Sequence, residues 1–245
     1  WQRLAGGGQL AGQRVAVVGG GAGSVEVALA IAHRLRDEAP AVTLYCGSPK
    51  LLEGYAAGAR RVVERQLQSL GIELATGRRV AAVAERQLRF EGGLTAPYDE
   101  LILCTGAAAT PWVAGSGLPV DERGFLAVRD TLQSTRYPEI FGAGDIATQL
   151  THPRPKAGVY AVRQGPVLAQ NLAAFARGDA LKEHRPQHRF LSLLSLGEKA
   201  AVAERNGFSL RGAWVWRWKD HIDRQFMARF SDLPERAMAP GTYPG

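Results

Sequence analysis

Residues 19–24, Gly-Gly-Gly-Ala-Gly-Ser, are the first group whose types and spacing could do chemistry. They follow the apolar run Val-Ala-Val-Val at 15–18, which is typical of a strand buried in a parallel sheet, and they lead into a helical pattern over 24–36. In such a turn the first glycine permits a sharp bend. The second lets the backbone approach a pyrophosphate that faces the helix N-terminus. The stretch therefore predicts a dinucleotide loop formed by Gly19, Gly21, Gly23 and Ser24.

The residues at the end of the next predicted strand, 41–46, help to decide which dinucleotide this loop would bind. An acidic residue there would bind the ribose hydroxyls of NAD, but the strand expected at 41–46 ends in Cys46. Lys50 could instead meet the 2′-phosphate of NADP, so NADH and NADPH both remain open. Ser24 at the third glycine position, together with Cys46, also leaves open a nicotinamide site that has decayed. Cys46 could equally be a small buried apolar group at a strand end.

These residues need a scaffold of alternating strands and helices, and the sequence predicts one. An amphipathic helix over 57–70 ends at Gly71, and residues 98–106 return to a buried strand. Between them lie three short segments that we interpret as a small antiparallel meander, at 72–77, 79–84 and 87–93. This order predicts one nucleotide-binding domain over residues 12–110.

The second half of the chain has a different pattern. Residues 138–148 predict a short apolar strand that ends in small residues and Asp145. Residues 155–178 predict a helix that Pro166 bends or divides. Short alternating segments then predict antiparallel strands, and an aromatic helix is expected over 214–230.

The aromatic segment allows two interpretations. Trp214, Trp216 and Trp218 alternate as in a strand, and apolar residues then recur at helical spacing with basic residues between them. An amphipathic aromatic helix can lie in a membrane interface, which would make the protein peripheral to a membrane. Asp220 and Asp223 weaken attraction to anionic lipid, and amphipathic helices usually face a protein core, so we favour packing against the flavin domain or in a dimer contact.

Composition narrows the functional classes. The 245 residues carry a net charge of +7, but the basic residues are scattered and no nucleic-acid motif accompanies them, so no nucleic-acid partner is expected. No apolar run is long enough to span a membrane. Two cysteines without C-x-x-C spacing argue against a zinc site or redox pair and favour a cytoplasmic protein. Pro186 breaks the spacing between His184 and His188, so no metal site is expected.

Several motifs together resemble the pyridine nucleotide–disulfide oxidoreductase superfamily. Residues 138–148, PEIFGAGDIAT, resemble its second flavin motif, in which Asp145 would hold the ribityl hydroxyls of FAD. Residues 101–112, LILCTGAAATPW, resemble the segment that joins the nicotinamide domain back to the flavin domain. Together with the loop at 19–24, these motifs stand in the family's order. Residues 153–172 are similar to the NADH dehydrogenase and sulfide–quinone reductase branch.

The resemblance extends over the whole chain. Residues 190–230 look closest to the NADH-dehydrogenase-like module that is fused to selenide, water dikinase in some bacterial proteins. The family has an earlier β-α-β unit for the ADP half of FAD, and no glycine loop precedes the strand at 15–18. The resemblance therefore implies a fragment that lacks this unit and carries little FAD by itself. The implied fold is α/β. After a linker at 1–11, residues 12–110 would form a Rossmann-like NAD(P)-binding domain with a parallel sheet and a small antiparallel meander. Residues 111–180 would form the C-terminal part of an FAD-binding domain, and residues 181–245 a small α+β region of antiparallel strands plus an aromatic C-terminal helix.

The resemblance also implies a reaction. The family moves a hydride from the nicotinamide to the flavin and then passes electrons to a second acceptor, here a quinone or another small molecule. The alternative is a flavoprotein whose decayed nicotinamide site leaves it a scaffold or gives it another electron donor.

Particular residues take roles by the same resemblance. Glu26 would act near the nicotinamide–flavin junction, or it would only complement the dipole of its helix. Lys156 would lie at a helix N-terminus that stabilises the reduced flavin, and Tyr160, Arg163 and Gln164 are candidates for the acceptor side. The remaining expected cofactor contacts are Thr105, Gly106, Gly144, Asp145, Ala157, Gly158 and Val159.

Overall fold

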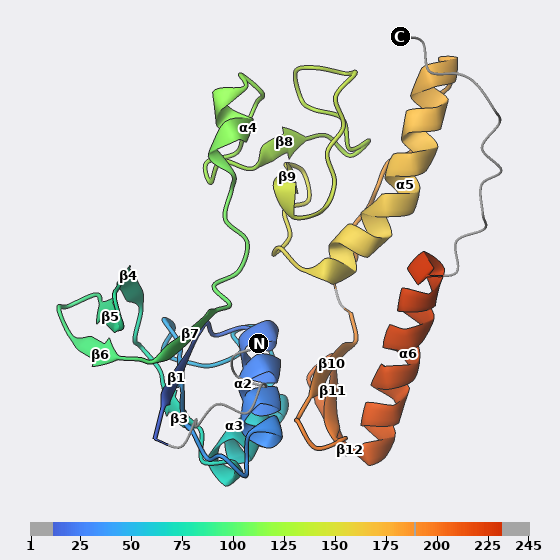
Figure 1. The fold of residues 1–245 in the computed structure, drawn as a ribbon. Helices are drawn as coiled ribbons and strands as arrows, with labels where there is room; N and C mark the ends of the chain where they lie inside the picture. The colour runs from blue at the N-terminus through green and yellow to red at the C-terminus, as the bar shows by residue number, and fades with distance from the viewer. Residues whose placement is uncertain (1–11, 189, 232–245) are drawn as a thin grey trace, which may run out of the picture. The chain divides into compact units, whose positions relative to one another are not determined.

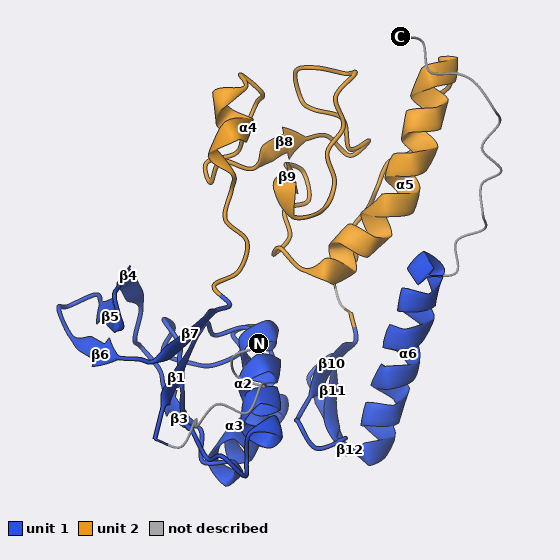
Figure 2. Ribbon diagram, viewed as in Figure 1, with its two compact units in different colours: residues 1–104, 191–245 blue, residues 105–190 orange. Residues whose placement is uncertain are grey.

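The computed structural model describes residues 12–188 and 190–231. The chain divides into two compact units (Figures 1 and 2). Unit 2 spans residues 105–190, and unit 1 takes the described residues on either side of it. The linker expected at 1–11 and the last part of the expected C-terminal region, 232–245, lie outside the described residues.

Unit 1 is built on a parallel sheet of four strands. They are β1 (Arg14–Val18), β2 (Ala41–Tyr45), β3 (Glu73–Ala75) and β7 (Glu100–Leu103). They lie in the order β3-β2-β1-β7, so β1 is central, and Val17 stands between Leu44 on β2 and Ile102 on β7. The carboxyl end of β1, where the glycine loop begins, is therefore flanked by the ends of two neighbouring strands.

The position of β3 corrects one expectation. The prediction that residues 72–77 belong to the antiparallel meander is wrong, because β3 pairs parallel to β2. Helix α3 (Ala57–Ser69) connects β2 to β3, and a crossover of this kind returns the chain in the same direction. The meander consists of β4 (Val80–Ala84), β5 (Gln87–Phe90) and β6 (Thr95–Pro97), which pair antiparallel.

The side chains of β1 alternate between two cores. Val17 packs with Leu29 of helix α2 (Ala22–Arg34), in the core that also takes in α3. Ala16 points the other way and packs with Leu88 of the meander. Helices thus cover one face of the sheet and the meander contributes to the other, which matches the fully buried sequence of this strand.

Residues 191–231 complete unit 1 rather than forming a unit of their own. Strands β10 (Ser192–Ser195), β11 (Ala201–Arg205) and β12 (Phe208–Gly212) form an antiparallel sheet, followed by helix α6 (Ala213–Ser231). Leu194 and Leu196 lie in the same core as Leu29 of α2. This packing joins the C-terminal segment to the helix that follows the glycine loop.

Helix α6 starts directly after Gly212, so the strand-like alternation of the tryptophans does not persist in the structure. Trp214 and Trp218 are one helical turn apart and are 53% and 42% exposed, whereas Val215 is fully buried. In the described part of the chain, no helix has the length and apolarity needed to cross a membrane.

Unit 2 contains few regular elements. They are α4 (Pro111–Gly115), β8 (Leu126–Val128), the 3₁₀ helix η1 (Gly144–Ile146), β9 (Ala147–Gln149) and α5 (Gly158–Arg177), with β8 parallel to β9. The strand predicted at 138–148 is wrong. Phe141 forms an isolated bridge, and Gly144, with a φ of +74°, then allows the tight η1 turn.

Helix α5 runs through Pro166 without dividing. Proline leaves the carbonyl four residues earlier without its helical donor, and that residue, Val162, is 46% exposed, so water can take the donor's place. The helix ends at Gly178, whose φ of 77° is the left-handed conformation that glycine adopts without strain.

Candidate cofactor sites

The glycine loop combines two closely packed glycines with two open ones. A Cβ atom at Gly19, where φ is +147°, would overlap the carbonyl oxygen of Cys104, and one at Gly20 would come within 2.5 Å of the Cys46 sulfur. At Gly21 and Gly23 a Cβ would meet nothing within 4 Å. The inner glycines therefore let the loop pack on the sheet, and the outer ones leave backbone accessible to a ligand.

The helix behind this loop starts without a side-chain cap. Gly21 is the N-cap of α2, and the first turn contains no acidic residue. The hydroxyl of Ser24, only 1% exposed, donates to the Gly21 carbonyl at 2.7 Å. This inward bond leaves the amides of the first turn available to an anion. The donor set fits a pyrophosphate, and Ser24 occupies the third glycine position without entering that space.

The loop after β2 would lie at the adenosine end of a dinucleotide. Cys46 is fully buried, its sulfur lies 3.7 Å from the Lys50 carbonyl, and burial raises the pKa of its thiol. Lys50 is exposed. The amide of Arg78 donates to the Cys46 carbonyl at 2.9 Å, which brings the basic pair at 78–79 beside this loop. Sequence reasoning missed this pair because it follows β3, some thirty residues beyond the loop it joins.

Glu26 contacts the C-terminal segment of unit 1. Its Oε1 accepts the backbone N–H of Ser195 at 2.8 Å and lies 3.6 Å from the Lys219 ammonium on α6. Lys219 also donates to Asp223 at 2.7 Å. Burial alone would lower the Lys219 pKa, but these two carboxylates raise it. Since α2 begins at Ala22, Glu26 lies beyond the first turn, and the helix-dipole interpretation of Glu26 loses its basis.

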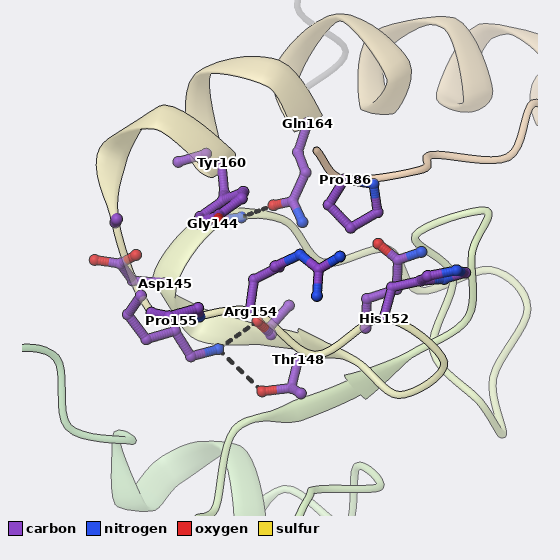
Figure 3. A pocket seen from close by; sticks show the side chains of 14 residues that line it. Gly144, Asp145, Thr148, His152, Arg154, Pro155, Tyr160, Gln164 and Pro186 are labelled. Carbon is purple, nitrogen blue, oxygen red and sulfur yellow. Dashed lines mark hydrogen bonds between the residues drawn. The ribbon is translucent and has the colours of Figure 1, made fainter. Parts of the chain in front are cut away.

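Unit 2 contains a hollow of about 360 Å³, including its open mouth (Figure 3). The η1 turn with Gly144 and Asp145, the segment with Lys156 and Ala157, and the start of α5 line it. Gly158 and Val159 continue the first turn of α5. Thr105 and Gly106 are exposed at the beginning of this unit and do not line the hollow.

The donors and acceptors around this hollow fit a polar cofactor that carries hydroxyls and negative charge. The Asp145 carboxylate is exposed, and no hydrogen bond from a described residue holds it. Ala157 is the N-cap of α5 without a side-chain cap, and a Cβ at Gly158 would meet nothing within 4 Å. An acceptor for hydroxyls thus lies beside a helix N-terminus that favours negative charge.

Lys156 is engaged by its own unit. Its ammonium donates to the Ala147 carbonyl at 2.5 Å and to the Thr148 hydroxyl at 3.0 Å, and it lies 4.0 Å from the centre of the Phe125 ring. Burial lowers the pKa of this ammonium against the opposing effect of Asp121 and Asp145. These contacts fasten the segment before α5 onto β9.

The three residues expected on the acceptor side differ in burial and in their contacts. Tyr160 is 8% exposed and packs edge-on against Phe190, with ring centres 5.8 Å apart. Arg163 is exposed. Gln164 is 8% exposed, and its Oε1 accepts the Gly144 N–H at 2.6 Å. Gln164 therefore contacts the η1 turn directly.

A buried polar network near the hollow was not expected from the sequence. His184, 6% exposed, contacts Gln149 Oε1 through its Nδ1 at 3.1 Å, and Gln149 Nε2 donates to Asp130 at 2.5 Å. Burial lowers the pKa of His184. His188 contacts Arg154 instead, so the two histidines have separate partners. No group of metal-binding side chains is found within residues 12–188 and 190–231.

Known proteins are similar to this chain in sequence and in fold. A family model described as pyridine nucleotide-disulphide oxidoreductase matches residues 3–165. Fe-regulated protein 8 of Mycosarcoma maydis is 30% identical over 200 residues, which are 78% of this chain and 49% of that protein. An NADH dehydrogenase-like protein of Mycobacterium tuberculosis is 31% identical over 140 residues, covering 54% and 35%. The chain thus spans half or less of the length of these relatives.

A solved structure shows the same fold over nearly the whole chain. The sulfide:quinone oxidoreductase of Aquifex aeolicus matches 94% of this chain and 60% of its own, with a TM-score of 0.71 at 18% identity. The match of the family model covers both the glycine loop and the Asp145 turn. By this match, the chain belongs to the pyridine nucleotide-disulphide oxidoreductase family.

Proposed function

We propose that the chain is the nicotinamide-binding part, together with the C-terminal flavin-binding part, of an FAD-dependent NAD(P)H oxidoreductase. The observation that carries the proposal is a repeated arrangement. In each unit a helix without a side-chain cap begins beside an open glycine, Gly21 before α2 and Gly158 at the start of α5. Beside α5, Asp145 adds an exposed carboxylate that no described residue hydrogen-bonds. One site would take a pyrophosphate, and the other the flavin.

The residues would divide the work by their chemistry. The first-turn amides of α2 would hold the dinucleotide pyrophosphate, with Gly23 leaving room for it. Asp145 would accept hydrogen bonds from the ribityl chain, and the α5 N-terminus would stabilise negative charge near Ala157 and Gly158. Bound FAD would supply the hydride-accepting chemistry. Lys156 would keep the segment before α5 in place through its bonds to Ala147 and Thr148.

Glu26 would act as an anchored carboxylate behind the nucleotide loop. Its partner Lys219 was not a candidate from the sequence, because nothing in the pattern of α6 points to a residue on α2. The pair would place one negative and one positive group near the nucleotide site, on the helix that follows the glycine loop. Thr105 and Gly106 would serve at the connection between the units.

The names of the relatives support a quinone or another small molecule as the electron acceptor, since one is NADH dehydrogenase-like and one solved structure is a sulfide:quinone oxidoreductase. Because the match covers only about half or less of each relative, the activity would belong to a longer flavoprotein. The resemblance of residues 190–230 favours one that also carries a selenide, water dikinase domain. A homodimer and a cytoplasmic or membrane-peripheral location complete the proposal.

Calorimetric titration of the purified protein with NADH and with NADPH tests the nicotinamide site. We expect Gly21→Val to weaken binding at least about tenfold, since its side chain would occupy the open space where the ligand approaches. The extended backbone of Gly21 accommodates a β-branched residue, so the fold should survive. Gly165→Ala, in unit 2, is the matched control. Absence of binding by the unaltered protein would favour the decayed nicotinamide site instead.

A further inference from the structure

Gln164 is a buried amide that connects two parts of the expected flavin site. It lies on α5, two turns after the N-terminus that lines the hollow, and it is 8% exposed. Its Oε1 accepts the backbone N–H of Gly144 at 2.6 Å, as the dashed line in Figure 3 marks. The bond therefore joins the η1 turn to α5 through one side chain.

The η1 turn needs a partner of this kind. Gly144 has a φ of +74°, the left-handed conformation, and its N–H points toward α5 rather than into a strand ladder. A Cβ at Gly144 would lie 3.5 Å from the Ala161 side chain, so turn and helix are closely packed. Loss of the acceptor would leave a partly buried N–H without its hydrogen bond, which costs more than the bond itself contributes.

The η1 turn also sets the direction of the Asp145 side chain. Asp145 follows Gly144 directly, and no hydrogen bond from a described residue orients its carboxylate. The Lys156 ammonium acts on this carboxylate by charge and not by a hydrogen bond, so its direction relative to the α5 N-terminus depends largely on the backbone of η1. That backbone is tied to α5 by Gln164.

We propose that Gln164 is a positioning residue for the flavin site, acting through the Gly144 N–H to hold Asp145 in register with the first turn of α5. The inference rests on the proposed function, because the flavin is the ligand that both elements would contact. It differs from a direct role of Gln164 on the electron acceptor, for which the side-chain NH₂ would be the available group.

Two substitutions separate these roles. Gln164→Glu keeps an oxygen that can accept the Gly144 N–H but removes the NH₂. Gln164→Met keeps the length of the side chain but removes the acceptor. Gln170→Met, at an exposed position on the same helix, is the matched control.

Amide hydrogen exchange at Gly144, measured by NMR on this chain without cofactor, tests the clamp. We expect exchange in Gln164→Met to be at least about tenfold faster than in the unaltered chain, and exchange in Gln164→Glu and Gln170→Met to stay within about twofold. Unchanged exchange at Gly144 in Gln164→Met overturns the inference, whatever the cofactor does.

Flavin binding and acceptor kinetics in the FAD-loaded flavoprotein test the consequence. Gln164→Met should release FAD about tenfold more readily and shift its visible spectrum, with the acceptor KM unchanged, and Gln164→Glu should retain the flavin. A raised acceptor KM in both variants, with normal FAD retention, overturns the positioning role in favour of direct contact. If the unaltered flavoprotein holds no FAD, the proposed function fails, while the Gly144 exchange still decides whether the clamp exists.

Discussion

Glu26 offers the sharpest test of how unit 1 is held together. Its carboxylate meets two groups from the C-terminal segment: the N–H of Ser195 at 2.8 Å and the Lys219 ammonium at 3.6 Å. The side chains of Glu26 and Lys219 are 30% and 21% exposed, so solvent screens this ion pair only in part. Glu26→Gln keeps an acceptor for Ser195 and removes only the charge. Glu26→Ala removes both.

The two variants should therefore differ in stability. An unsatisfied, partly buried N–H costs about 1–3 kcal/mol, whereas a partly exposed ion pair contributes roughly 0–1 kcal/mol. With an m value of about 2 kcal/mol/M in urea, Glu26→Ala, which loses both, should lower the midpoint by about 0.5–2 M, and Glu26→Gln by about 0.5 M or less. Tryptophan emission can follow unfolding of unit 1 in a Trp112→Phe background, since the other described tryptophans are on α6.

Equal destabilisation by both variants would refute this reasoning, because it would make the charge of Glu26, not its hydrogen bond to Ser195, the stabilising feature. The same pair separates structure from chemistry. A Glu26→Gln protein of nearly unchanged stability that binds NADH or NADPH less tightly would support a direct role of the carboxylate in the nicotinamide site.

Three further predictions follow from other sites. If the protein prefers NADPH, Lys50→Ala should remove the preference, and unchanged selectivity in paired NADH and NADPH titrations would count against Lys50. Because burial lowers the His184 pKa from 6.5, the folded chain resists protonation that the unfolded chain accepts. The contribution of His184 to the stability of unit 2 should therefore be fully present above about pH 6.5 and fall below it. When unfolding is followed by hydrogen exchange across pH 5–8, this fall in stability should be smaller in His184→Gln. Leu196→Ala should destabilise unit 1 by about 2–5 kcal/mol in urea denaturation, because this fully buried side chain packs in the α2 core; an effect below 1 kcal/mol would show that the C-terminal segment is not part of that core.

The parts of the fold that could be predicted are those set by local pattern. The apolar run of β1, the glycines after it and the periodicity of α2 depend on neighbouring residues, and each formed where it was expected within a few positions. The short strand β3 was misassigned because three residues carry no directional signal, and only the α3 crossover makes it parallel. The tryptophan pattern misled for a similar reason: the turn at Gly212 decides where β12 ends and α6 begins.

The candidate sites show the same division. Gly21 could be named from the sequence because the glycine turn and the helix after it are locally distinctive, whereas Asp145 and Ala157 were named only through the family resemblance. Lys219 and Gln164 owe their positions to long-range contacts, with Glu26 across 193 positions and with Gly144 across twenty, which no local pattern encodes.

Several of these long-range contacts arise because the chain returns to unit 1 after unit 2. Unit 1 holds the glycine loop, yet part of its core comes from residues that follow unit 2. Leu194 and Leu196 pack on α2, and Ser195 between them donates to Glu26 on that same helix. Since three consecutive residues at the end of β10 supply both the buried leucines and the Glu26 hydrogen bond, the glycine loop and the C-terminal segment should gain or lose order together.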